Sequence, residues 1–140
     1  MSDFSKKISE YLIARSYPTY NENCGRCAKA VREAVEFVLD PKKIERTESA
    51  KNYGPSYEKI GFKKVFSFPE QDKQQYKPEI GDLAIIKYEP HGHICIYCFG
   101  KDLKTNKNFC GWVSDFRQRD MYGGIIRKKN PSFDIYRYGI

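Results

Sequence analysis

Cys27 is the residue of this chain best placed for nucleophilic chemistry, because it lies where a helix is expected to begin. The apolar residues that follow it recur with helical spacing, at Val31, Val35 and Val38. A thiol in the first turn of a helix lies at the positive end of the helix dipole, which favours the thiolate. The pattern therefore predicts a thiolate that attacks carbonyl carbon atoms.

A cysteine nucleophile needs a base, and the chain has two histidines, His91 and His93. His91 lies in a turn between proline and glycine, whereas His93 begins a predicted strand that would hold its imidazole more rigidly. Period-two alternation places His93 on the same face of that strand as Cys95. We therefore predict that His93 is the base. Such a base needs a partner that fixes its tautomer, and Asp115, at the end of a later strand, is the predicted hydrogen-bond acceptor.

The elements that must carry these residues change in character along the chain. Asp3 is expected to cap a first helix that ends before Pro18, and the helix of Cys27 is expected to end at Asp40. Residues 42–53 could be helical, and a helical turn at 56–60 and an irregular strand at 62–68 follow. Four short apolar runs bounded by turn residues then predict strands, at 83–88, 94–99, 109–113 and 133–138. Helices first and strands later predict an α+β fold, with the N-terminal helices packed on an antiparallel β-sheet.

Length, charge and cysteine content limit the class of protein. The 140 residues suit one domain, residues 1–140, with a proper core. The net charge of +7 favours an acidic partner, but the basic residues are scattered as on a solvated surface. No stretch is long enough to insert into a membrane, and the N-terminus carries no signal-peptide core, so we expect synthesis in the cytoplasm. Five cysteines without a secretory signal argue against a disulfide framework.

Five motifs, taken together, resemble a known family. In chain order they are Gly25-Arg26-Cys27-Ala28 with Val31-Arg32, Tyr53-Gly54-Pro55 with Gly61-Phe62, Pro78-Glu79-Ile80-Gly81-Asp82-Leu83, Gly92-His93-Ile94, and Trp112-Val113-Ser114-Asp115-Phe116. Their order and spacing over residues 20–138 resemble the papain-like peptidoglycan hydrolases of the NlpC and CHAP type, especially the small amidase effectors of type VI secretion. The resemblance implies a cysteine that begins a helix packed on an antiparallel sheet.

The resemblance also implies an activity, which is hydrolysis of an amide bond in the stem peptide of peptidoglycan. Cys27 would be the nucleophile, His93 the base and Asp115 the orienting residue, with no metal ion or other cofactor. The bond between D-glutamate and diaminopimelate is favoured over the bond between muramic acid and L-alanine. Tyr20, close before the helix, could line the substrate groove.

The same resemblance predicts the setting in which the protein works. It would be a monomeric antibacterial effector that is injected by a secretion machine and acts in the periplasm or cell wall of a target cell. Its expected partners are the peptidoglycan stem peptide and a cognate immunity protein, with no nucleic acid. The lack of a signal peptide also fits a phage-type lysin with the same chemistry.

Other assignments of the cysteines remain open. Cys24-x-x-Cys27 and Cys95-x-x-Cys98 offer the four thiolates of a structural zinc site, which on a basic surface would indicate a nucleic-acid-binding module. Strand alternation, however, would point Cys95 and Cys98 to opposite faces. Cys-Gly-Arg-Cys at a helix start also resembles a thioredoxin-type redox pair, although the preceding residues 16–23 are too polar for the buried strand such a pair follows. A disulfide between Cys24 and Cys27 could also silence the nucleophile until it is reduced.

Overall fold

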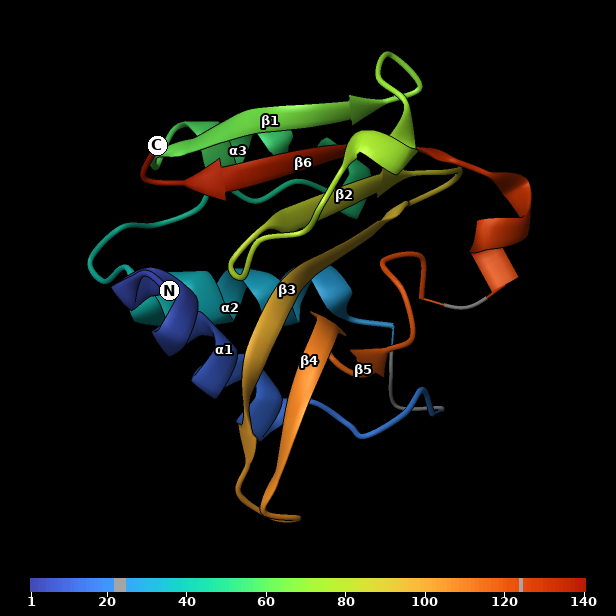
Figure 1. Cartoon of the computed structure of the whole chain (residues 1–140). Coiled ribbons are helices and arrows are strands. Elements are labelled where there is room, and N and C mark those ends of the chain that lie inside the picture. Colours follow the sequence, from blue (N-terminus) through green and yellow to red (C-terminus); the bar gives the residue numbers. More distant parts are fainter. Residues whose placement is uncertain (22–24, 124) are drawn as a thin grey trace.

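The structure, a computed structural model, describes residues 1–21, 25–123 and 125–140 (Figure 1). Its helices are α1 (Asp3–Arg15), α2 (Cys27–Val38) and α3 (Gly54–Glu58), with 3-10 turns η1 (Ala50–Asn52), η2 (Lys73–Gln75) and η3 (Ile125–Lys129). Its strands are β1 (Phe62–Phe68), β2 (Leu83–Lys87), β3 (His93–Asp102), β4 (Lys107–Val113), β5 (Arg117–Gln118) and β6 (Ser132–Tyr138). The α+β class is therefore confirmed.

The strands form one antiparallel sheet in the order β1-β6-β2-β3-β4-β5 (Figure 1). β6 is the last strand in the sequence, yet it lies between β1 and β2, so the first and last strands of the chain pair at one edge of the sheet. The predicted antiparallel sheet is thus confirmed. The long strand β3 is the centre of the site described below, because α1, α2, β2 and β4 all contact it.

The sheet has a hydrophobic core on each face. On one face all three helices pack against the sheet, and the buried residues there include Ile8, Leu12, Val31, Val35, Tyr57, Phe62, Ile85, Ile94 and Ile96. On the other face a second cluster contains Phe66, Ile86, Cys95, Trp112, Tyr122, Phe133 and Ile135. The alternation predicted for β3 is present, because Ile94 belongs to the helix-covered core and Cys95 to the opposite one.

Several element boundaries differ from the predictions. The cap of α1 is Ser2 rather than Asp3, since the Ser2 hydroxyl oxygen accepts a hydrogen bond from the Ser5 N–H at 3.0 Å. Only the three residues of η1 are helical within 42–53, because the rest of that segment has few apolar residues to pack against the core. The two-residue strand β5 was not predicted, and it has consequences for the site.

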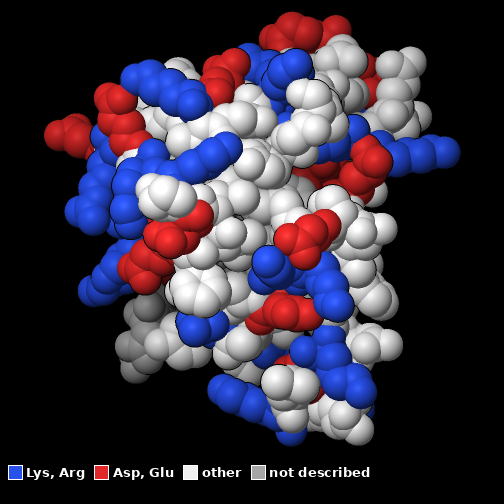
Figure 2. Space-filling model, turned by 90° about the vertical axis from the view of Figure 1, so that its left-hand side faces the viewer, with Lys and Arg blue, Asp and Glu red and all other residues white. Residues whose placement is uncertain are grey.

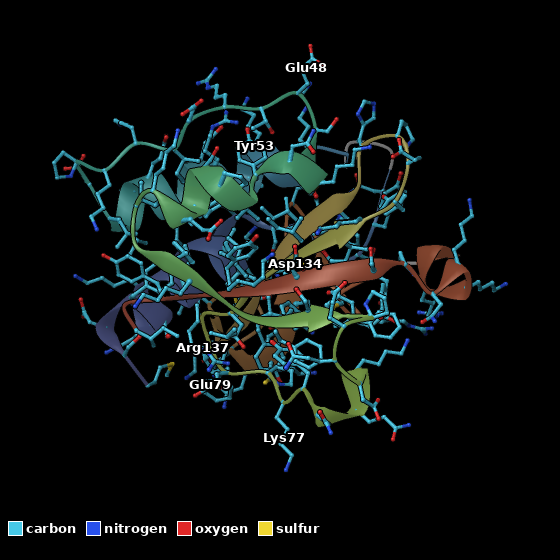
Figure 3. All side chains as sticks on the ribbon, turned by 90° about the horizontal axis from the view of Figure 1, so that it is seen from above. Glu48, Tyr53, Lys77, Glu79, Asp134 and Arg137 are labelled. Carbon is cyan, nitrogen blue, oxygen red and sulfur yellow. The ribbon has the colours of Figure 1, made fainter. Side chains whose placement is uncertain are left out.

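A buried ion pair joins the start of β2 to β6. The Asp82 carboxylate is fully buried and accepts hydrogen bonds from Arg137, with Nε at 2.7 Å and Nη2 at 3.0 Å. It also accepts from the Tyr76 hydroxyl and the Glu79 N–H. Arg137 forms a further ion pair with Glu79, and the two side chains lie side by side in Figure 3. This cluster fixes the turn that precedes β2.

The surface carries charges of both signs. Figure 2 shows Lys and Arg side chains interspersed with Asp and Glu on the face that it presents, without one continuous basic track. In the part of the chain that the structure describes, every helix is too short or too polar to cross a membrane.

Candidate active site

Cys27 and His93 line the same cavity, which has a volume of about 610 Å³. The first residue of α2 supplies Cys27 and the first residue of β3 supplies His93. Asp115 and Tyr20, the other two residues predicted from the sequence, also line it. The remaining lining residues are Gly25, Tyr88, His91, Gly92, Phe116 and Gly123. The structure thus brings all four predicted residues to one cavity, although it does not give all of them the predicted contacts.

The Cys27 thiol is protonated in this arrangement. Burial raises the pKa of Cys27 to about 11, and the negative charge of Asp115 contributes in the same direction. Hydrogen bonds from backbone N–H groups, above all that of Ile94, act to lower this pKa but do not compensate for burial. We expected the helix dipole to favour the thiolate. The loss of contact with water outweighs the dipole here, because the sulfur lies largely inside the protein.

His93 is a buried and neutral imidazole. Burial lowers the pKa of His93 below its ordinary value, while the hydrogen bond with Gln118 and the charges of Asp115 and Asp120 act to raise it. The side chain is 7% exposed. A base must be unprotonated to accept a proton, so this shift keeps His93 ready for that role at neutral pH.

The hydrogen bonds of Gln118 assign the tautomer of His93. The Gln118 amide nitrogen donates to the Asp120 carbonyl oxygen at 2.9 Å, so its Oε1 must face the imidazole, where it lies 2.8 Å from Nε2. Because Oε1 can only accept, Nε2 of His93 carries the hydrogen. The free lone pair of the neutral ring is therefore on Nδ1.

Asp115 does not make the hydrogen bond with His93 that the sequence predicted. Its carboxylate oxygen Oδ2 accepts hydrogen bonds from the N–H groups of Gly25 at 2.9 Å and Arg26 at 2.8 Å, immediately before the cysteine. Gln118 contacts the imidazole instead, because β5 folds back on β4 and pairs Gln118 with Trp112. In the sequence, the only indication that Gln118 points into the protein is its spacing of two from Phe116, which places both on the same face of a strand. Both side chains are buried in the structure.

Ser114 connects the two halves of the site. Its hydroxyl oxygen lies 2.7 Å from Gln118 Oε1 and 3.1 Å from Asp115 Oδ1, and both of these atoms are acceptors. The hydroxyl has one hydrogen, so it donates to one of these two acceptors at a time and lies between the His93–Gln118 contact and the contacts of Asp115 with the backbone that precedes Cys27. Gln118 thereby holds the base and Asp115 holds the backbone before the nucleophile, with Ser114 between them.

Two further side chains shape the mouth of the cavity. Tyr20 is 65% exposed, and its ring meets Phe116 edge-on with centroids 5.3 Å apart. His91 is exposed, and its Nδ1 lies 3.0 Å from the Ser49 hydroxyl oxygen. Both histidines thus reach the cavity, but only His93 is buried and held by Gln118.

The zinc alternative conflicts with the positions of Cys95 and Cys98. Cys95 packs in one core and Cys98 in the core on the opposite face of β3, so they cannot bind the same ion. Across residues 1–21, 25–123 and 125–140, no group of three or more His, Cys, Asp or Glu side chains could hold a metal ion. The predictions that involve Cys24, including its disulfide with Cys27, concern a residue outside the described part of the chain.

Comparison with known proteins identifies the family. No protein-family model and no curated protein matches the chain. Two solved structures do match it, the native and selenomethionine crystal structures of the type VI effector–immunity complex Tae3–Tai3 from Ralstonia pickettii. Each matched chain is 31% identical in sequence, with TM-scores of 0.72 and 0.69. The matches cover 96% and 93% of this chain and 98% of each matched chain.

The chain belongs to the Tae3 family of type VI effectors. The type VI part of the resemblance drawn from the sequence motifs is therefore confirmed. Since the match to Tae3 extends over almost the whole of both chains, the Tae3-like fold includes both the helix of Cys27 and the strand of His93.

Because the thiol of Cys27 is protonated in this Tae3 family member, we predict that its reactivity depends on pH in an unusual way. The rate of its alkylation by iodoacetamide should keep rising through pH 9, with a midpoint near the thiol pKa of about 11. The reason is that only the thiolate reacts, and burial disfavours it. Mass spectrometry of the peptide that contains Cys27 gives the rate. A rate that is already constant at neutral pH would mean that the thiol rests as a thiolate paired with an imidazolium.

Proposed function

We propose that the chain is a cysteine amidase with a papain-like, NlpC/CHAP-type domain over residues 1–140 that hydrolyses the stem peptide of peptidoglycan. The observation that carries this proposal is the shared cavity of Cys27 and His93 in a chain of the Tae3 family. A helix that begins with the cysteine and packs on an antiparallel sheet supports it further. No metal ion or cofactor is needed for this chemistry.

The neutral pair suggests a specific order of events. As the Cys27 sulfur attacks the carbonyl carbon of the amide, Nδ1 of His93 takes the thiol proton. The protonated imidazole then gives this proton to the leaving nitrogen, and a thioester to Cys27 remains. Water, deprotonated by the same imidazole, attacks the thioester and releases the acid and the free thiol. Each cycle therefore consumes one water molecule and returns both residues to their neutral forms.

Asp115 limits which backbone groups can stabilise the tetrahedral intermediate. The N–H groups of Gly25 and Arg26 already donate to its carboxylate, so neither is free for the substrate oxygen. The N–H of Cys27 itself, in the first turn of α2, then remains as a donor for that oxygen. Asp115 thereby acts as a positioning residue for the nucleophile rather than as the partner of the base.

The family supports a proposal for the biological role. Tae3 was crystallised in an effector–immunity complex, and we propose that this chain likewise is an antibacterial effector with a cognate immunity protein. It would act as a monomer in the periplasm of a target cell, where the stem peptides are accessible. Its net charge of +7 favours contact with these carboxylate-bearing peptides. The bond between D-glutamate and diaminopimelate is the proposed site of cleavage.

Replacing Gln118 by leucine should lower kcat by about 100-fold, at the low end of what a positioned base contributes. Leucine cannot accept the hydrogen bond from Nε2, so the ring loses its fixed tautomer and orientation. Steady-state hydrolysis of a soluble stem peptide measures this effect.

Gln118→Glu is the matched control for this prediction, because glutamate keeps the acceptor and adds a negative charge. The charge should raise the pKa of His93. When the pH is lowered, the variant should therefore lose activity at a higher pH than the wild type does. In the wild type, the loss of activity at acidic pH should occur below about pH 6.5, because burial lowers the pKa of His93. Identical pH profiles in all three proteins would contradict the contact between Gln118 and the base.

Digestion of purified Gram-negative peptidoglycan tests the proposed function. Muropeptides released by the wild-type protein are separated by chromatography and weighed by mass spectrometry. Cleavage between D-glutamate and diaminopimelate yields disaccharide dipeptides, whereas cleavage before L-alanine yields sugars without peptide. Cleavage of no amide bond in intact or glycan-digested peptidoglycan would contradict an amidase, whereas products of cleavage at another amide bond would contradict only the proposed site.

A further inference from the structure

A second cavity adjoins that of Cys27 and His93. Its volume is about 460 Å³, and Asp115 lines both cavities. α1 and α2 form most of its wall, which comprises Tyr11, Leu12, Arg15, Tyr17, Arg26, Lys29, Ala30, Glu33, Ser114 and Asp115. Arg26 directly precedes Cys27, so their Cα atoms are about 3.8 Å apart. The second cavity therefore begins beside the nucleophile.

The cations of this cavity outnumber the carboxylates that are free to neutralise them. Glu33 pairs with Lys29 at 3.7 Å. The Asp115 carboxylate already accepts hydrogen bonds from the N–H groups of Gly25 and Arg26. The two guanidinium groups, of Arg15 and Arg26, have no carboxylate partner within residues 1–21, 25–123 and 125–140. Arg15 and Arg26 thus both line the cavity, and among the described residues neither forms an ion pair with a carboxylate.

The backbone that presents these cations is held in place. The Arg15 guanidinium lies 3.7 Å from the centre of the Tyr11 ring, which orients it by stacking. The backbone N–H of Arg26 is bound by Asp115. Tyr17 is fixed as well, because its N–H donates to the Asp115 carbonyl oxygen and its own carbonyl oxygen accepts from the Arg117 N–H, both at 2.9 Å. The segment that orders the catalytic residues therefore also orders this cavity.

We propose that the second cavity is a carboxylate subsite, so that the stem peptide lies across both cavities with one of its carboxylates on Arg15 and Arg26. This inference rests on the proposed function. A guanidinium group presents paired N–H donors whose geometry matches the two oxygens of a carboxylate. Stem peptides carry carboxylates close to the proposed scissile bond, on glutamate and on diaminopimelate. A carboxylate held beside Cys27 would position that bond over the sulfur and select acidic peptides over amidated ones.

Binding of two matched peptides tests the subsite. The ligands are the tripeptide L-alanyl-γ-D-glutamyl-diaminopimelate and the same peptide with its carboxylates amidated. The proteins carry Cys27→Ala, so the peptide stays intact, together with Arg15→Gln and Arg26→Gln. The control carries Cys27→Ala and Arg46→Gln, which removes one exposed arginine outside both cavities. Isothermal titration calorimetry gives each Kd at low and at moderate salt.

The acidic tripeptide should bind about tenfold more weakly to the Arg15→Gln/Arg26→Gln protein than to the control, because charge-assisted hydrogen bonds are lost. The amidated peptide should bind both proteins equally, and added salt should weaken the binding of the acidic peptide more for the control than for the double variant. In proteins with Cys27 intact, the double replacement should raise KM by more than it lowers kcat, as expected when most of the lost interaction is ground-state binding.

Equal binding of the acidic peptide by both proteins would overturn the subsite. This conclusion would hold even if the two arginines bound an acidic protein instead. Equal loss for the acidic and the amidated peptide would also overturn it, because the effect would then not depend on the carboxylates. If the wild type cleaves peptidoglycan in either case, the proposed function stands and only the subsite fails. If the wild type neither cleaves peptidoglycan nor binds the tripeptide, both fail.

Discussion

Cys27→Ala should lower the rate of stem-peptide hydrolysis by at least about 10⁴-fold, because the removal of a nucleophile eliminates the covalent route. The fold should be unaffected. Cys27 as a whole residue is partly exposed at the first position of α2, although its sulfur is largely buried, and alanine is the best helix former. Circular dichroism and the midpoint of urea unfolding should therefore match those of the wild type.

Cys110→Ala is the matched control for Cys27→Ala. Cys110 is exposed on β4, where its thiol contacts the Tyr97 hydroxyl at 3.4 Å, and it does not line the catalytic cavity. Its replacement should leave the rate of hydrolysis unchanged. The assignment of the nucleophile would be contradicted if Cys27→Ala retained a rate similar to that of Cys110→Ala.

Asp82→Ala should have the largest effect on stability, with a loss of about 3 kcal/mol in the free energy of unfolding. Asp82 is fully buried, and its removal leaves the Tyr76 hydroxyl and the Glu79 N–H without their acceptor. It also takes the buried partner from Arg137. We place the value at the low end for a broken buried pair because the Arg137 side chain is 27% exposed. Urea unfolding followed by tryptophan fluorescence measures it.

Glu79→Ala tests whether the stabilisation by the Asp82–Arg137 pair depends on its burial or only on its charge. The Glu79 carboxylate also pairs with Arg137, but its side chain is 62% exposed. An exposed ion pair contributes at most about 1 kcal/mol, so this variant should lose far less stability than Asp82→Ala. Equal losses in the two variants would show that burial of Asp82 does not matter.

Local patterns in the sequence predicted most of the elements that carry the site. The helix of Cys27 and the strand that begins at His93 follow from apolar periodicity, which depends only on neighbouring residues. The position of Gln118 beside His93 does not follow from apolar periodicity, because β5 has only two residues and is defined by its pairing with β4. Asp115 was predicted for that role from its place at a strand end. At that strand end, its carboxylate instead accepts hydrogen bonds from the backbone just before α2.

The protonation of Cys27 shows a second limit of local patterns. The helix start is visible in the sequence and predicts a lowered thiol pKa. Burial of the sulfur depends on how α2 packs against the start of β3, which no local pattern reveals, and burial is the larger effect. Ser2 and Asp3 illustrate a smaller case, since both are good capping residues and only the backbone geometry distinguishes them.

The most direct test of a Cys27 nucleophile is detection of the thioester itself. The wild type is mixed with the acidic tripeptide, quenched in acid within milliseconds and digested, and the peptide that contains Cys27 is weighed. A mass increase equal to the L-alanyl-D-glutamyl acyl group, located on Cys27 and absent from Cys27→Ala, is the result that we predict. Hydrolysis of the tripeptide with no acyl group on Cys27 at any quench time, and at an undiminished rate in Cys27→Ala, would contradict it.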